Sequence, residues 1–415
     1  MRGEGVVIRN LRVATDRDVG IRMTPDASAL VSGVWVDGTE VALVGFRGRL
    51  EVEDSLVTDA HTWGLQMEAG LEAVVRRVAF VDVGETALRV VTQATLDFED
   101  VVVRGATDAK LASPLALVEQ TTVSGRRLVL EDNLGPPISV TGEGASLSLE
   151  DAVVRDPTER AASGIRVLSG GALTLRRAHL SGLPLYAVGA ADPGSRVWIE
   201  DSLVERARAV TGRSSAAAIE VDDGAEATLA RVAVIESEGL GVLVHGARLA
   251  AEDLVVAATA PHASSLGRAL QVQNGSTASI ARALLLRNHE ASIVVSSSST
   301  LEATDLRVAE SLPRGCASST CPDHPAGFGV SAIDGSVRLE RFAVEDSALC
   351  GIQIARAGSL DALVGHVRRN AIAVCLQVPG YDVGRLTDRV LYTENGATIE
   401  ATTFLVPDPA SPTLP

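Results

Sequence analysis

The sequence has very little of the positive charge that nucleic-acid-binding and membrane-binding proteins use. It contains a single lysine, Lys110, and its 53 acidic residues outnumber its 37 basic residues, so the formal net charge is −16 over 415 residues. Nucleic acids and anionic membranes attract clustered positive charge, which makes both of them poor partners. No apolar run approaches the roughly 20 residues that cross a bilayer, so we also expect no membrane span.

Aromatic residues and cysteines are scarce as well. Aromatic residues make up 3% of the chain, which argues against a long platform for stacking sugar rings. There are four cysteines. Cys316 and Cys321 share one loop and favour a local disulfide over a zinc half-site, because the tight C-x₂-C spacing is absent. Cys350 and Cys375 lie in or beside predicted strands, and we interpret them as buried thiols. A disulfide would favour an oxidising compartment.

No segment shows sustained helical periodicity. Instead, units of ten residues with a common pattern recur along the chain. Period-two alternation within each unit predicts a half-buried strand, and a second short strand such as Gly164–Val167 or Gly351–Ile354 follows each unit. The units begin at residues 6, 29, 50, 73, 96, 123, 147, 173, 197, 227, 249, 278, 301, 337, 360 and 383. Their eighth position is always apolar: Val13, Val36, Val57, Phe80, Val103, Leu130, Val154, Leu180, Val204, Val234, Val256, Leu285, Val308, Val344, Val367 and Val390. Position seven is mostly apolar too, which predicts either an exposed apolar stripe or side chains turned partly inward.

The fifth position of the repeat alternates in charge and indicates how the units are arranged. Twelve successive units carry Asp54, Arg77, Asp100, Arg127, Asp151, Arg177, Asp201, Arg231, Asp253, Arg282, Asp305 and Arg341. Equivalent positions of a parallel β-helix stack about 4.8 Å apart. Like charges would repel in such a column, whereas alternating charges attract both neighbours. The sequence therefore predicts an all-β, right-handed parallel β-helix of about sixteen coils.

The repeat resembles the right-handed parallel β-helix repeat family, the pectin-lyase-like superfamily that includes pectate lyases and polygalacturonases. The resemblance rests on Gly-Ile-x-Val followed by an alternating unit every 23 or so residues, and it covers nearly the whole chain. It implies the fold and leaves the function open, because this fold carries enzymes, adhesins and passive stalks. The chain lacks the asparagine ladder common at corners in the family, and the Asp/Arg column takes its place.

The catalytic motifs of the family transfer poorly. Asp222-Asp223 and His245-Gly246 superficially match two of the four polygalacturonase motifs, whereas the Asn-Thr-Asp and Arg-Ile-Lys motifs are absent. We therefore assign no catalytic residue and no metal ligand. The pattern favours a non-catalytic scaffold or recognition module with carbohydrate as a candidate ligand. The alternative is a polysaccharide lyase or glycoside hydrolase.

A candidate binding site follows from stacking the short strands. With Ile219 and Val221 inward, the outward side chains should be Glu220, Asp222, His245, Gln271 and Gln273, with Asp222 beside His245 and His245 beside Gln273. A carboxylate next to an imidazole can do acid–base work, and clustered carboxylates can hold calcium. The alternative interpretation is an ordinary solvated strand face.

Chain organisation and surroundings complete the expectations. We expect one β-helix domain over residues 1–400 and a mobile, proline-rich tail over 401–415. Insertions at 106–114, 157–163, 206–217, 258–268 and 311–328 should leave the coil at one corner and flank the candidate groove. We predict an extracellular or cell-surface protein that binds a polysaccharide or another surface protein, with its oligomeric state undetermined.

Overall fold

The computed structural model describes residues 5–16, 18–106, 113–155, 163–210, 216–262, 267–314 and 326–414. In it the chain forms a parallel β-solenoid of about sixteen turns, which confirms the predicted fold class. The described residues group into two compact units. Unit 1 comprises residues 1–184 and 190–198, and unit 2 comprises 185–189 and 199–415. Among the described residues, no helix is long and apolar enough to span a membrane.

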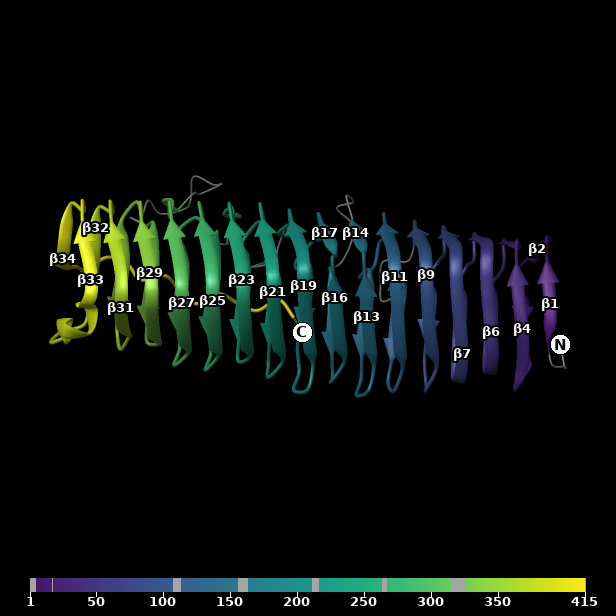
Figure 1. Cartoon of the computed structure of the whole chain (residues 1–415). Helices are drawn as coiled ribbons and strands as arrows, with labels where there is room; N and C mark the ends of the chain where they lie inside the picture. Colours follow the sequence, from purple (N-terminus) through teal and green to yellow (C-terminus); the bar gives the residue numbers. More distant parts are fainter. Residues whose placement is uncertain are drawn as a thin grey trace. The chain divides into compact units, whose positions relative to one another are not determined.

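Each turn contributes a long segment that bends once, followed by a short strand, and each segment pairs in parallel with its equivalent in the next turn (Figure 1). The long segments of unit 1 are β1 (Val6–Arg9), β2 (Arg12–Ala14), β4 (Ala27–Ser32), β5 (Trp35–Asp37), β6 (Val41–Thr58), β7 (Trp63–Val81), β9 (Thr95–Arg104), β11 (Thr122–Glu131), β13 (Ser146–Glu150), β14 (Val153–Arg155), β16 (Ala172–Arg176) and β17 (His179–Ser181). Its separate short strands are β3 (Val19–Arg22), β8 (Thr86–Val90), β10 (Leu115–Val118), β12 (Ile138–Thr141) and β15 (Ile165–Leu168).

Unit 2 repeats the arrangement. Its long segments are β21 (Glu226–Ile235), β23 (Arg248–Ala257), β25 (Thr277–Leu286), β27 (Thr300–Ala309), β29 (Ser336–Glu345), β31 (Ser359–Arg368) and β33 (Asp388–Thr393). Its short strands are β20 (Ala217–Asp222), β22 (Leu240–His245), β24 (Arg268–Gln273), β26 (Ala291–Ser296), β28 (Phe328–Ile333), β30 (Cys350–Ala355), β32 (Ile372–Leu376) and β34 (Ala397–Ala401). Strands β18 (Val188–Ala190) and β19 (Arg196–Glu205) contain the boundary between the units, and η1 (Val383–Leu386) is a short 3₁₀ helix.

The core of each unit is the column of apolar side chains that every turn directs inward. Position eight is fully buried at Val57, Phe80 and Leu130 in unit 1 and at Val256 and Val344 in unit 2. The predicted unit starts are in register from 6 to 173 and from 227 to 360. The last one is wrong by two residues. Leu363 pairs with Asp388, so that unit begins at 385 and its eighth position is Tyr392 instead of Val390.

The bend in each long segment lies at position five. All sixteen residues there have φ between +49° and +63°: Asn10, Gly33, Asp54, Arg77, Asp100, Arg127, Asp151, Arg177, Asp201, Arg231, Asp253, Arg282, Asp305, Arg341, Val364 and Arg389. Asn, Asp and Gly tolerate this left-handed conformation best, and a β-branched residue is strained in it. One repeated backbone requirement thus accounts for the short residues at half of these corners.

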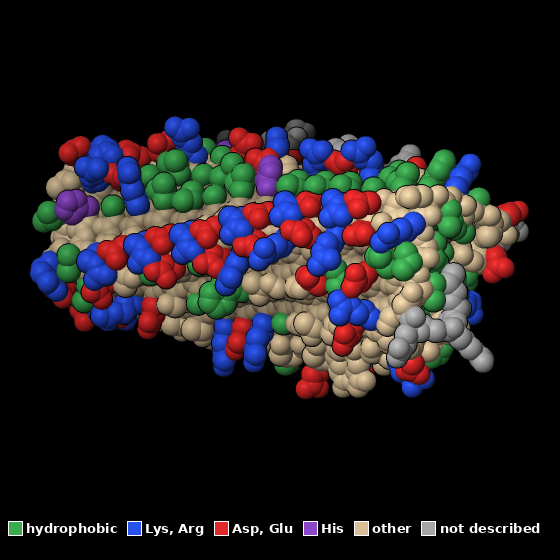
Figure 2. Space-filling view, turned by 45° about the vertical axis from the view of Figure 1, so that its right-hand side comes forward, with side chains coloured by type: hydrophobic (Ala, Val, Ile, Leu, Met, Phe, Trp, Pro, Cys, Tyr) green, Lys and Arg blue, Asp and Glu red, His purple; other side chains and the backbone are tan. Residues whose placement is uncertain are grey.

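The alternating charges at these corners pair two turns at a time. Arg77 donates from Nε to Asp54 Oδ1 at 2.6 Å and from Nη2 to Oδ2 at 2.8 Å. The same bidentate arrangement recurs at Asp100–Arg127 and Asp151–Arg177 in unit 1 and at Asp201–Arg231, Asp253–Arg282 and Asp305–Arg341 in unit 2. The hydrogen bonds from Arg77 hold the pKa of Asp54 below its usual value. Figure 2 shows the blue and red side chains alternating beside hydrophobic ones.

Candidate functional site

The five predicted site residues lie on the outer face of the short strands of unit 2. Asp222 of β20 pairs in register with His245 of β22, and His245 pairs with Gln273 of β24. Glu220 and Gln271 occupy the neighbouring outward column, with Leu243 between them. The predicted stacking is therefore confirmed.

These side chains are nevertheless not solvated. Glu220 and Gln271 are fully buried, Gln273 and Asp222 are nearly so, and only His245 is partly exposed. The cover is the C-terminal tail, residues 402–414, which we had expected to be mobile. The expectation of a solvent-facing row is wrong for this reason.

The tail is held mainly through its backbone. Ala410 donates its N–H to Gln273 Oε1 at 2.9 Å, and Gln273 Nε2 donates back to the Ala410 carbonyl. Glu220 accepts hydrogen bonds from the backbone N–H groups of Thr413 and Leu414, at 2.5 and 3.1 Å, and from the Thr413 hydroxyl. Peptide groups of the tail make all but one of these hydrogen bonds.

Nearer to the beginning of the tail, side chains of the face again bind its backbone. Gln377 Nε2 donates to the Phe404 carbonyl at 2.6 Å, and Arg268 Nη1 donates to the Asp408 carbonyl at 2.7 Å. The tail therefore runs from β32 back to β20, across the strands and opposite to the order in which they follow one another along the chain.

Apolar contacts fix the tail between these hydrogen bonds. Phe404 and Val406 pack on a buried cluster composed of Ala291, Val294, Ala326, Phe328, Ile333, Cys350, Ala355, Ile372 and Cys375. Ala410 packs on a second cluster composed of Ala217, Leu240 and Leu243. Leu414 is 7% exposed, and a Cβ added at Gly189 would come within 3.0 Å of its Cδ2. The tail thus covers outward apolar side chains that would otherwise face water.

A disulfide lies under the tail. Cys350 of β30 and Cys375 of β32 are bonded, with their Cα atoms 6.0 Å apart, and both are fully buried. Our interpretation of them as buried thiols was right about their burial and wrong about the thiols, because the two residues belong to one cluster on adjacent turns and are bonded to each other. Cys316 and Cys321 lie outside the described residues.

Beneath the tail lies a buried ionic network that the sequence did not reveal. Arg268 is fully buried and donates from Nε to Glu290 Oε2 and from Nη1 to Gln271 Oε1, both at 2.5 Å. Gln271 Nε2 in turn donates to Gln273 Oε1 at 3.0 Å. Burial lowers the pKa of Arg268, and the charge of Glu290 opposes that shift. The only sequence signal was an arginine at a strand start where β22 and β26 have Leu240 and Ala291.

The Asp222–His245 pair suits acid–base chemistry. His245 Nδ1 lies 2.6 Å from Asp222 Oδ1, and Asp222 Oδ1 also accepts from the backbone N–H of Asp223. The His245 side chain is 24% exposed. A carboxylate that binds Nδ1 orients the ring and directs Nε2 away from itself, as in a base assisted by a carboxylate.

The structure does not locate a site for the calcium ion that we considered. Among the described residues, no group of three or more His, Cys, Asp and Glu side chains could hold a metal ion. Calcium therefore remains a prediction without assigned ligands. Of the predicted insertion wall, His262 lies 3.6 Å from Glu238, and most of the remaining insertion residues lie outside the described part of the chain.

We predict that docking of the tail depends on pH through Glu220. Burial raises the pKa of its carboxyl, although the hydrogen bonds from Thr413 and Leu414 oppose this effect. A carboxyl whose pKa is raised in the docked state favours docking below its ordinary value of 4.5, and that contribution is lost as the pH rises through the raised pKa. Hydrogen-exchange protection of residues 404–414, corrected for intrinsic rates, should fall by about ten-fold per pH unit between the ordinary and the raised pKa. Glu220→Gln should flatten this dependence, and an equal slope in both proteins would exclude Glu220 as its source.

Comparisons with known proteins add little to this chain's own geometry. No protein-family model matches the sequence, and no curated protein matches it significantly. Solved structures that match include a periplasmic alginate epimerase, AlgG, at 10% identity and a TM-score of 0.30 over 93% of this chain and 78% of that one. Another is a mannuronic-acid-specific family 6 polysaccharide lyase from human gut microbiota, at 9% identity and a TM-score of 0.36 over 94% and 91% of the two chains.

Proposed function

We propose that the protein is a recognition module that binds an extended polysaccharide along the short-strand face of unit 2, in the place where its own tail lies. The observation that carries the proposal is the tail itself, an extended chain held across β32 to β20 by a row of polar side chains. Gln273, Gln377 and Arg268 donate to its backbone, and Gln273 and Glu220 accept from it. Amide, carboxylate and guanidinium groups can pair equally well with sugar hydroxyls.

The proposed location is extracellular or periplasmic. Disulfides persist in oxidising compartments and are rare in the cytosol. The Cys350–Cys375 bond is consistent with that location.

The test is to compare the full chain with a variant that ends at Ala401, after confirming by circular dichroism that the variant keeps its β-structure. Neutral and acidic polysaccharides are titrated against each protein. We expect the truncated protein to bind at least one of them about ten-fold more tightly, because the docked tail holds most molecules in a closed state. Added synthetic peptide 402–415 should displace the ligand. If the peptide rebinds but no polysaccharide binds the open face, the proposal is wrong.

A second candidate, polysaccharide cleavage, is favoured by the 2.6 Å contact between Asp222 and His245. His245 would act as the base, and Asp222 would orient it. The same titrations are followed for new chain ends. Cleavage by the truncated protein that is lost in His245→Ala and reduced in Asp222→Asn would make the protein an enzyme, and binding without new ends would leave the recognition function alone.

A further inference from the structure

The ladder of aspartate–arginine pairs has one incomplete member, near the C-terminal end of unit 2. Six pairs are complete, and Asp305–Arg341 is the last of them. At the next two corners the residues are Val364 and Arg389, which lie in successive turns. Arg389 therefore occupies the arginine position of a seventh pair in which valine replaces the aspartate.

The absence of that aspartate changes what Arg389 binds. Its Nε lies 3.2 Å from Asp388 Oδ1, a single contact with the preceding residue, and its side chain is 71% exposed. Arg341, which has its aspartate, is 50% exposed. The residue before Val364 is Leu363, so the turn supplies no carboxylate at the fourth position either, where Glu340 and Asp388 stand in the turns on each side.

A trough of about 470 Å³ lies at this incomplete pair. Its charged lining consists of three arginines, Arg307, Arg341 and Arg389, against one carboxylate, Asp305, and His366 lies on the same wall. Val364 and Leu391 contribute apolar surface, and Leu391 is 56% exposed. Arg341 is clamped by Asp305 and Arg307 pairs with the buried Glu345, so Arg389 is the arginine of this lining that lacks a fifth-position carboxylate, and it lies beside open apolar surface.

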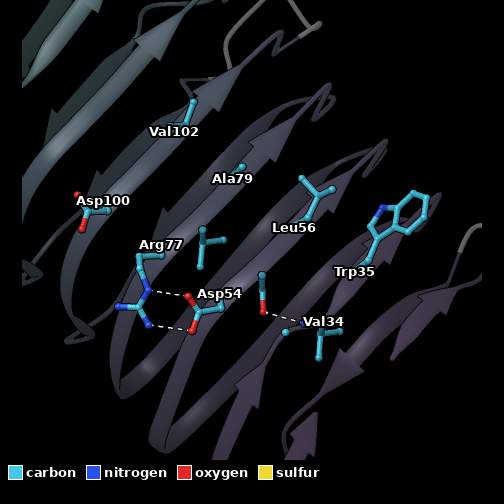
Figure 3. Close-up of a pocket in the computed structure, with 11 residues that line it drawn as sticks. Val34, Trp35, Asp54, Leu56, Arg77, Ala79, Asp100 and Val102 are labelled. Atoms are coloured by element: carbon cyan, nitrogen blue, oxygen red, sulfur yellow. Dashed lines mark hydrogen bonds and ion pairs between the residues drawn. The ribbon is translucent and has the colours of Figure 1, made fainter. Parts of the chain in front are cut away.

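Unit 1 contains the equivalent trough with an intact ladder, of about 440 Å³. Figure 3 shows Arg77 clamping Asp54 with two hydrogen bonds, Asp100 one turn further on, and Leu56 and Ala79 beside them. Here one arginine lies among two aspartates. The two troughs have similar sizes and equivalent positions, and they differ in the charge at the fifth position and in Arg307 and His366 at the seventh, where the first trough has apolar side chains.

We propose that the trough over Val364 binds the carboxylate of an organic anion, which takes the place of the missing aspartate. Nε and Nη2 of Arg389 clamp it as Arg77 clamps Asp54, and planar guanidinium–carboxylate pairing of this kind is the strongest that arginine makes. Arg341, in the turn on the other side of Val364, stays clamped by Asp305. The apolar body of the ligand lies on Val364 and Leu391. This site is independent of the tail-covered face of unit 2.

The test uses benzoate as the probe and benzamide as its uncharged control. Binding is followed through the Nε–H signal of Arg389 in ¹H–¹⁵N spectra of the full chain. We expect benzoate, and not benzamide, to shift that signal. Val364→Asp supplies the carboxylate internally, so it should shift the same signal without ligand and weaken benzoate binding by about ten-fold or more. Val364→Asn tolerates the left-handed backbone equally well and adds no charge, so it should keep binding. Unchanged benzoate affinity in Val364→Asp would overturn the proposal.

The proposed anion site can also be introduced into unit 1, as a matched gain-of-function test. The double variant Glu99→Leu/Asp100→Val copies Leu363-Val364 into the turn that precedes Arg127, which normally binds both of these carboxylates. We expect benzoate to shift the Nε–H signal of Arg127 as well, and the stoichiometry to rise from one to two. A stoichiometry that stays at one in a folded variant would show that Arg307 and His366 carry the site, contrary to the proposal.

Discussion

Replacing Arg268 with leucine should destabilise unit 2 by about 3–5 kcal/mol, the range found when one partner of a buried ion pair is removed. Arg268 is fully buried and Glu290 nearly so. Without the guanidinium, the Glu290 carboxylate would remain in a site that excludes water, with Arg314 Nε at 3.8 Å as its nearest remaining charge partner. Loss of the hydrogen bond to the Asp408 carbonyl would loosen the tail in addition.

The measurement is urea unfolding of unit 2, followed by hydrogen exchange in β24 and β26. Arg268→Leu/Glu290→Leu should recover most of the loss, since an apolar pair of similar volume can replace a buried ion pair at little cost. Arg248→Leu is the matched control. It also removes an arginine at the start of a strand, but this side chain is 77% exposed and pairs with the exposed Glu226, so stability should hardly change. A single variant as stable as wild type would show that the Arg268–Glu290 pair does not stabilise unit 2.

The fold could be predicted from the sequence because almost every turn repeats the same residue pattern. Inward apolar residues and the charge at position five recur from turn to turn, so the neighbouring units correct the placement of any one of them. The start of the last unit was predicted wrongly because this pattern is lost there. Past Arg341 the charge alternation stops at Val364, and without it the start at 383 could not be distinguished from the correct start at 385.

The pairing of the candidate site residues was predicted correctly, whereas their burial under the tail was not. Strand alternation is local, so the stacking of Asp222 on His245 follows from counting residues. Burial of Glu220 depends on Thr413, which lies 193 positions away in the sequence. A proline-rich tail has no periodicity from which such a contact could be predicted. The sequence pattern of β24 gave no sign that its glutamines are buried.

The cysteines illustrate the same limit. Cys350 and Cys375 are separated by one full turn of the solenoid, 25 residues, so they can meet only if both side chains lie on the same face of adjacent turns. Cys350 is the first residue of β30, where strand alternation gives no clear direction, whereas Cys375 lies inside β32 and pairs with Gln353. The outer face there carries the apolar cluster on which Phe404 and Val406 pack.

Removing that disulfide should lower the stability of the C-terminal turns by about 3 kcal/mol, the entropic effect expected for a closed loop of this length. Cys350→Ala/Cys375→Ala keeps the site apolar, so the loss reports the cross-link more than a change in polarity. Hydrogen exchange in β30 and β32 is the appropriate measurement, because a solenoid unfolds in neighbouring turns and a single global value would average the effect away. Exchange in β22 should stay unchanged and serves as the internal control.

The position of the bond under the tail gives this prediction a second, independent check. Both cysteines are fully buried in the cluster on which Phe404 and Val406 pack, so we expect a reductant to reach them mainly when the tail lifts. Reduction of the native protein should therefore be slow, and it should become much faster in the variant that ends at Ala401. If both proteins were reduced at the same rate, the turns around β30 and β32 would open without the tail leaving, and the disulfide rather than the tail would be holding that end of the solenoid closed.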